Sequence, residues 1–209
     1  RGVPAKAAFP NSFSYGNDAV ETVSYDPDGA KKLLEESGWT DTDGDGYVDK
    51  DGQKLSINWL TYPTRLEQPK LAEYAQATLK DIGIDVVVNN TSDHMTIAKN
   101  GDFDVYVSSI TTAPTGDPEY FFTSTVTGAK NYGNYQNEEV TKLTDQLHQT
   151  FDKDERAKLA VELQQDILDD DAFFFVSHLN MGIVTKSNVT GMAAHPCDYY
   201  EITADLDVE

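Results

Sequence analysis

The stretch that decides the fold runs from Lys54 to Asn90 and reads "KLSINWLTYPTRLEQPKLAEYAQATLKDIGIDVVVNN". Its first part, through Tyr62, alternates apolar and polar side chains and predicts a β-strand. An amphipathic helix follows and stops at Gly83, with an apolar stripe made of Leu71, Tyr74, Ala75, Thr78, Leu79 and Ile82. The closing "IDVVVNN" predicts a second strand, and its almost entirely apolar composition is typical of strands buried on both faces.

The residues on either side extend this pattern. A short helix near Met95–Asn100 leads to a third strand, "DFDVYVSSI", from Asp102 to Ile110. Upstream, Asp26 is expected to cap a helix that starts at Pro27 and ends at Gly38. Leu33 and Leu34 are expected to face inward from that helix. Alternating strands and helices predict an α/β fold with a mixed or largely parallel sheet and flanking helices.

The second half of the chain is predominantly helical. "PEYFFTSTV", from Pro118 to Val126, favours a helix, and two further helices are expected over 138–151 and 153–170. The run "FFFVSHLNMGIVTK" then indicates a hairpin or two strands. We therefore expect an extended entry segment over 1–24, an α/β lobe over 25–190 and a tail over 191–209.

The composition excludes several classes of protein. The 209 residues include 36 Asp and Glu against 16 Lys and Arg, a net charge of −20, which disfavours nucleic acid or an anionic membrane as partner. The 39% hydrophobic content supports a folded domain. A single cysteine, Cys197, excludes an internal disulfide framework. No apolar run is long enough to predict a membrane span, and the chain, which opens on Arg1, is interpreted as a fragment of a longer one.

The stretch "DTDGDGYVDKDG", from Asp41 to Gly52, has the spacing of a calcium loop. Its expected ligands are the carboxylates of Asp41, Asp43, Asp45 and Asp49 and the carbonyl of Tyr47. Position twelve is Gly52 instead of a bidentate Glu, and a strand rather than a helix follows, which excludes an EF-hand sensor. Two interpretations remain: a weak structural calcium site and a metal-free acidic turn in a surface hairpin.

Two loops are candidates for ligand binding, because ligands of open α/β sheets sit beyond the carboxyl ends of the strands. The loop "TYPTRLEQP" contains Tyr62 and Arg65, and the loop "TTAPTGDPEYFF" contains Thr111, Thr112, Pro114 and Asp117. Asp117 has two readings: it pairs with a ligand amine, or it caps the helix that begins at Glu119. Tyr132, further along, is a candidate for stacking on a ligand.

Five segments in order resemble a known family. They are "YDPDGAKKLLEESGW", the acidic DGDG turn, "LAEYAQATLKDIGIDVVV", "GDFDVYVSSITTAPTGDPEYFF" and "DDDAFFFVSHLNMGIV". From Tyr25 to its end, the chain is similar to the carboxy-terminal lobe of extracellular solute-binding proteins of family 5, the peptide/nickel type. The resemblance implies a type II periplasmic-binding-protein-like receptor with two lobes, which serves an ABC importer and catalyses nothing. It also implies a tail that returns toward the amino-terminal lobe.

The resemblance leaves the ligand open. Arg65 stands where dipeptide-type members place an arginine that holds the ligand's carboxylate, with a solvated loop arginine as the alternative reading. Peptide-binding members have an aspartate where this chain has Pro114. Nickel-type members share the Ala113-Pro114 step, but they carry an aromatic at the place of Thr111 and a histidine in the loop that here reads "TGAKNYGNYQ".

The remaining candidates for chemistry are few. His94, His148, His178 and His195 share no metal-ligand spacing, and His178 is expected to be a hydrogen-bonded strand histidine. His195 and Cys197 form an isolated pair without an orienting partner. We therefore expect no enzyme and no required cofactor, with calcium as the one candidate ion.

The sequence thus predicts a receptor that captures small peptides or a related solute for an ABC permease. It is expected to act as a monomer outside the cytoplasm, lipid-anchored in its full-length form. The alternative is an autonomous extracellular module for adhesion or binding, stabilised by calcium.

Overall fold

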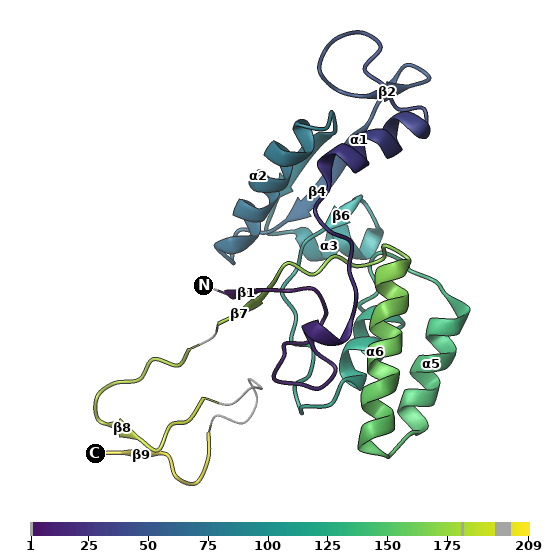
Figure 1. Cartoon of the computed structure of the whole chain (residues 1–209). Coiled ribbons are helices and arrows are strands. Elements are labelled where there is room, and N and C mark those ends of the chain that lie inside the picture. Colours follow the sequence, from purple (N-terminus) through teal and green to yellow (C-terminus); the bar gives the residue numbers. More distant parts are fainter. Residues whose placement is uncertain (1, 181, 195–201) are drawn as a thin grey trace. The chain divides into compact units, whose positions relative to one another are not determined.

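The structure is a computed structural model that describes residues 2–180, 182–194 and 202–209. The chain divides into two compact units (Figure 1). The first, called here the helical unit, comprises Arg1–Val23, Ile110–Asn131 and Tyr135–Glu209. The second, called the sheet unit, comprises Ser24–Ser109 and Tyr132–Asn134.

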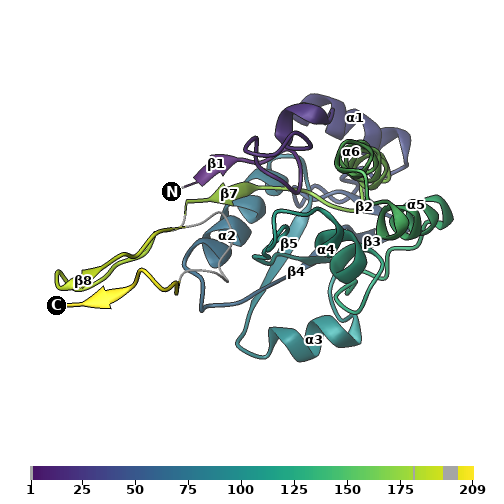
Figure 2. The same ribbon diagram turned by 90° about the horizontal axis from the view of Figure 1, so that it is seen from below.

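The sheet unit contains the predicted strand–helix–strand arrangement. Strands β4 (Ser56–Thr61), β5 (Asp85–Asn90) and β6 (Val105–Tyr106) form a parallel sheet in the order β5-β4-β6. Helix α2 (Glu67–Lys80) connects β4 to β5, and α3 (His94–Asn100) connects β5 to β6 (Figure 2). The register pairs Trp59 with both Val88 and Val105, so β4 is the central strand. The predicted parallel sheet is confirmed.

Three predictions of burial in this unit are wrong. Strand β5 lies at the edge of the sheet, and Val87 is 53% exposed although the strand was expected to be buried on both faces. Tyr74 is 72% exposed, whereas the other members of the predicted α2 stripe are half-buried and the fully buried residues of the helix are Gln68 and Ala72. In α1 (Pro27–Glu36), Leu33 is 65% exposed and Leu34 is half-buried. Apolar spacing identified the helices and most of the half-buried stripe of α2, but it did not separate the exposed apolar positions from the buried ones.

The turns that flank α1 follow the sequence rules. The Asp26 side chain accepts a hydrogen bond from the Gly29 N–H, and Pro27 is the first helical residue. After the helix, Gly38 adopts a left-handed φ of 85°. Strands β2 (Asp49–Lys50) and β3 (Gln53–Lys54) form the expected surface hairpin.

The helical unit is built on two long helices. These are α5 (Glu138–Gln149), capped by Asn137, and α6 (Lys153–Asp169), capped by Asp152 (Figure 1). Both predicted helices are confirmed to within two residues. The predicted Pro118–Val126 helix consists of a short α4 (Glu119–Phe121) followed by a π-helical turn, η2 (Phe122–Val126). Apolar side chains from these elements form the core cluster, which includes Phe121, Phe122, Val126, Val140, Leu143, Leu147, Leu159, Leu163 and Ile167.

The segment 1–24 is part of this core and is more than the predicted extended entry. It holds strand β1 (Gly2–Pro4) and the 3-10 turn η1 (Asn17–Ala19), and Phe9 and Tyr15 are buried between them. The fully buried Gln164 of α6 fixes the segment, because its Oε1 accepts from the Ala8 N–H (3.1 Å) and its Nε2 donates to the Tyr15 carbonyl (2.9 Å). The lack of periodicity hid this role, because the segment packs through irregular backbone.

The run from Phe173 to Lys186 does not form the predicted hairpin. Among its described residues one strand forms, β7 (Ser177–Leu179), which pairs antiparallel with β1. In the tail, β8 (Val189–Thr190) pairs with β9 (Asp207–Val208). The division into segments at residues 24 and 190 stays a prediction. Within the described residues, no helix combines the length and the apolar character that a membrane crossing requires.

Candidate functional site

In the sheet unit, the carboxyl edge of the parallel sheet carries a group of aromatic side chains. Tyr62 follows β4 directly, is 7% exposed, and stacks on His94 at the start of α3 with 4.1 Å between ring centroids. Tyr106, at the end of β6, lies with its Oη 2.8 Å from His94 Nδ1. Tyr132 contacts the Tyr106 ring at 6.2 Å in an edge-to-face geometry. We call Tyr62, His94, Tyr106 and Tyr132 the edge cluster.

Two members of the edge cluster are among the ligand residues predicted from the sequence. Tyr62 and Tyr132 were predicted, whereas His94 and Tyr106 were missed. His94 stands shortly beyond the predicted second strand, where ligand residues are expected. Tyr106 lies inside the predicted third strand, Asp102–Ile110, and is at a strand end because β6 stops at this residue. Burial raises the pKa of Tyr106 above its ordinary value, so this phenol is a neutral hydrogen-bonding group.

Arg65 lies in the loop between β4 and α2 and is exposed. Its guanidinium makes no hydrogen bond or ion pair with any described residue, which leaves the planar fork free to bind a carboxylate. It stands one residue before Leu66, the N-cap of α2, which has no side-chain cap. The uncapped amides of this helix start add partial positive charge next to Arg65.

Gln68, in the first turn of α2, joins the loop after β4 to the segment after β6. It is 2% exposed, and its Nε2 donates to Ser109 Oγ at 2.7 Å. The Ser109 N–H in turn donates to Tyr62 Oη at 3.2 Å. These two contacts order the carboxyl edge of the sheet unit around Tyr62.

In the helical unit, the predicted loop Thr111–Pro118 lies just before α4. Pro114 is buried, and Thr111 and Thr112 are half-buried. A turn closes the loop, with the Gly116 N–H donating to the Ala113 carbonyl at 3.0 Å and Gly116 at a φ of +78°. The Tyr15 hydroxyl donates to the Gly116 carbonyl at 2.9 Å, and burial raises the pKa of Tyr15 to about 12.

Asp117 pairs with a basic side chain of the protein itself. Its carboxylate accepts from Arg156 Nη2 (2.6 Å) and Arg156 Nε (2.9 Å), and Oδ1 also accepts from the Glu119 N–H (2.9 Å). The predicted contact with the start of α4 is therefore confirmed. Partial burial alone would raise the pKa of Asp117, but the hydrogen bonds from Arg156 and Glu119 outweigh it and lower that pKa below 3.8.

The predicted ligand residues are distributed over both units. Tyr62, Arg65 and Tyr132 belong to the sheet unit, whereas Thr111, Thr112, Pro114 and Asp117 belong to the helical unit. Their role as ligand contacts stays a prediction.

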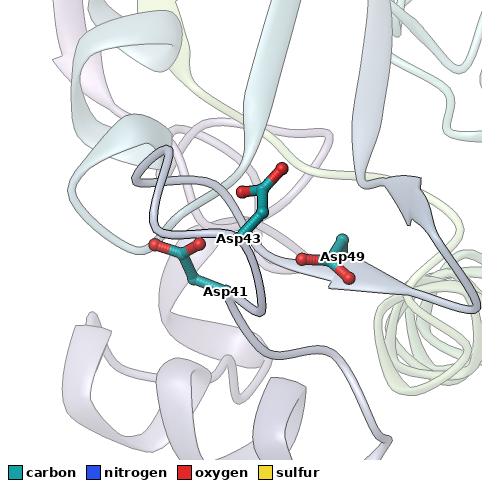
Figure 3. A group of neighbouring side chains, drawn as sticks. All are labelled: Asp41, Asp43 and Asp49. Atoms are coloured by element: carbon teal, nitrogen blue, oxygen red, sulfur yellow. The ribbon is translucent and has the colours of Figure 1, made fainter.

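The acidic loop of the sheet unit brings three of its carboxylates together. Oxygens of Asp41, Asp43 and Asp49 lie within 4.8 Å of one another (Figure 3). Asp45 is not in this group, and its Oδ1 accepts from the Tyr47 N–H at 2.9 Å. Asp41 accepts from the N–H groups of Gly44 (2.7 Å) and Gly46 (3.0 Å), so the loop is ordered by its own backbone. Calcium binding by these residues stays a prediction.

The comparison with protein families identifies the chain. Residues 1–133 match the family described as bacterial extracellular solute-binding proteins, family 5 Middle. The chain belongs to this family. The match covers the sheet unit except Asn134, together with β1 and the Thr111–Pro118 loop, and so includes every predicted ligand residue and every predicted metal ligand.

Relatives of this family 5 chain include proteins named for the binding of oligopeptides and of nickel. It is 31% identical over 201 residues to the oligopeptide-binding protein AppA of Bacillus subtilis, covering 92% of this chain and 37% of the relative. It is 26% identical to the nickel-binding periplasmic protein of Escherichia coli, over 92% of this chain and 38% of that one. The chain thus spans well under half the length of these relatives.

A solved structure agrees with the fold. AppA of Bacillus subtilis in complex with a nonapeptide superposes with a TM-score of 0.80 at 27% identity, covering 93% of this chain and 40% of that one. The predicted α/β fold of a lobe from a two-lobed solute receptor is confirmed, and the family is one of transport receptors. The comparisons give no support to an autonomous calcium-stabilised adhesion module.

Two histidines of the family 5 chain have structural partners. His178 Nε2 lies 2.9 Å from Asn17 Oδ1, which confirms the predicted hydrogen-bonded strand histidine, and burial lowers its pKa. His148 Nδ1 lies 2.6 Å from Glu119 Oε1. His195 and Cys197 lie outside the described residues.

Proposed function

We propose that the protein to which this chain belongs captures small peptides outside the cytoplasm and delivers them to an ABC permease. The observation that carries the proposal is the likeness to AppA, a protein solved with a bound nonapeptide, over 93% of this chain. In this mechanism ligand binding shifts the receptor toward a closed conformation that the permease recognises. We also propose that the full-length protein is lipid-anchored and acts as a monomer.

Arg65 is the proposed contact for the carboxylate of a peptide. Its guanidinium is exposed and makes no ion pair with the described residues, beside the uncapped start of α2. A charge-assisted bidentate contact with a carboxylate is among the stronger hydrogen-bonded pairs in proteins. The edge cluster, with Tyr62 and Tyr132, provides aromatic surface in the same unit, and Thr111, Thr112 and Pro114 provide the contacts proposed for the helical unit.

A nickel complex is the second candidate ligand, because the nickel-binding protein of Escherichia coli matches 92% of this chain. The segment 127–136, which reads "TGAKNYGNYQ", contains no histidine to bind the metal. His94, in the edge cluster, is a half-buried imidazole that stacks on the predicted ligand residue Tyr62.

The test is native mass spectrometry of the intact protein, purified without refolding and incubated with random nonapeptides. We expect a retained peptide, and we expect Arg65→Met to weaken binding by about tenfold or more. Lys70→Met, an exposed charge removal on α2, is the matched control and should change little. Amidation of the peptide carboxyl terminus should weaken binding to the parent protein and leave the peptide affinity of the Arg65→Met variant unchanged. Retention of a nickel complex and no peptide would contradict the proposal.

A further inference from the structure

The guanidinium of Arg156, in the first turn of α6, uses all five of its N–H groups in hydrogen bonds. Nε and one Nη2 proton go to the two carboxylate oxygens of Asp117, a parallel pair at 2.9 and 2.6 Å. The second Nη2 proton goes to Glu119 Oε2 at 2.9 Å. Nη1 donates to the carbonyls of Leu147 and Thr150, both at 2.6 Å. The side chain is 14% exposed, so this arrangement is largely removed from water.

These five bonds join segments that are distant in the sequence. Leu147 lies in the last turn of α5 and Thr150 is the C-cap residue of that helix. Asp117 and Glu119 belong to the start of α4 and the loop before it. Arg156 therefore ties the Thr111–Pro118 loop to both long helices of the helical unit.

The same loop has a second anchor at Gly116, which lies between the buried Pro114 and Pro118. Tyr15 donates to the Gly116 carbonyl, next in sequence to Asp117. The loop is thus fixed at two successive residues, by the phenol of the buried Tyr15 and by the half-buried guanidinium of Arg156. Thr111, Thr112 and Pro114 lie just before these anchors.

We propose that Arg156 is a positioning residue for ligand binding, which holds the Thr111–Pro118 loop in its binding conformation without touching the ligand. The inference rests on the proposed function. It gives Asp117 an internal role, since both carboxylate oxygens are already bound to Arg156. A lysine at position 156 would keep the charge, but its single ammonium group cannot reproduce the planar five-donor geometry.

The first arm of the test is amide hydrogen exchange of Arg156→Lys without ligand. The reporters are the amides of Gly116 and Glu119, which are hydrogen-bonded within the loop and at the start of α4. We expect both to exchange about tenfold faster, while core amides of α6 change little. Ile167→Val, which removes a buried methylene from α6, is the control for a general loss of stability. Asp117→Asn is a second variant, to be used if Arg156→Lys folds poorly. It should also speed the exchange of the Gly116 and Glu119 amides.

The second arm measures binding of the random nonapeptides by the same variants. We expect Arg156→Lys to lower affinity at least about fivefold, and Ile167→Val to leave it unchanged. Equal acceleration at every amide would show a purely structural role and overturn the proposal, as would a loosened loop with unchanged peptide affinity. A parent that retains no peptide contradicts the proposed function instead, and the exchange arm still decides whether Arg156 holds the loop.

Discussion

The two units of this chain are stabilised in different ways. Every residue of the hydrophobic core cluster belongs to the helical unit, where aromatic rings meet edge to face. Phe121, for example, contacts Phe9, Phe122, Phe173 and Phe175 at centroid distances of 5.3 to 6.0 Å. The described residues of the sheet unit bury a smaller apolar set, made of Leu60, Tyr62, Ala72, Ile84, Val86 and Ala98.

The difference teaches how each unit can contribute to binding. In the sheet unit, the candidate ligand residues lie at the edge of a three-stranded parallel sheet with a small apolar core. In the helical unit, the Thr111–Pro118 loop adjoins the hydrophobic core cluster and is held by Arg156, which donates five hydrogen bonds. Regions with few buried apolar contacts open at lower free energy. We expect the sheet unit to adapt to a ligand and the helical unit to provide the rigid side.

The largest expected effect comes from the aromatic core. Phe121→Ala should lower the unfolding free energy of the helical unit by about 3–5 kcal/mol, because Phe121 is fully buried and truncation leaves a cavity. Leu33→Ala, on the exposed face of α1, should cost less than about 0.5 kcal/mol. Urea unfolding followed by hydrogen exchange resolves the two units. A Phe121→Ala variant that loses the sheet unit first would break the comparison.

The next effect concerns Arg156 and its acidic partners. Removing the arginine in Arg156→Met leaves Asp117 without an ion-pair partner and Glu119 with His148 alone. It should cost about 1–3 kcal/mol at pH 7, a range reduced because Asp117 is 40% exposed. Lys158→Met, which breaks only an exposed pair with Glu155, should cost less than about 0.5 kcal/mol.

Lowering the pH should remove the stabilisation that comes from the pairing of Arg156 with Asp117 and Glu119. The hydrogen bond with His148, opposed by burial and aided by Arg156, lowers the pKa of Glu119 below 4.5, and the pKa of Asp117 also lies below its ordinary 3.8. Carboxylates with lowered folded pKa values stabilise the fold above the unfolded pKa and lose that contribution as pH falls through the folded value. The difference in melting temperature between parent and Arg156→Met should therefore narrow from pH 5 downward. A constant difference down to about pH 2 would contradict this account.

The smallest expected effect lies in the acidic loop of the sheet unit. Calcium at about 5 mM should raise the melting temperature of this unit by a few degrees, because Asp41, Asp43 and Asp49 place like charges within 4.8 Å. Asp43→Asn should abolish the rise, and Asp45→Asn, outside the group, should retain it. An equal rise in both variants, or with sodium chloride at matched ionic strength, would show screening alone.

The sequence predicted where helices and strands lie along the chain better than it predicted which elements pack or pair with one another. Helix caps at Asp26 and Asn137 or stops at Gly38 depend on nearby residues, and the strand–helix–strand order follows from local periodicity. The exposure of Val87 depends on which strand takes the sheet edge, and the pairing of β7 with β1 joins residues more than 170 positions apart. The local sequence pattern carries no information on the position of a strand within its sheet or on the pairing of distant strands.

The same limit applies to the candidate sites. Spacing identified Asp41, Asp43 and Asp49, but it could not exclude Asp45, whose carboxylate turns to the Tyr47 N–H. The family resemblance directed attention to Asp117, whereas its partner Arg156 lies 39 residues away on a helix that looked purely structural. His94 and Tyr106 became visible only when the strand ends were placed side by side.

The double contact of Gln164 with Ala8 and Tyr15 has a consequence for synthesis. The partners are 156 and 149 residues apart in the chain. At about 5–20 residues per second, the ribosome delivers Gln164 roughly 8–30 s after Tyr15. During that interval both segments of the sheet unit are synthesised and can fold, while the α6 residues that pack against Phe9 and Tyr15 are still incomplete. Nascent-chain chaperones that shield aromatic segments would therefore act on Phe9 and Tyr15 during this interval.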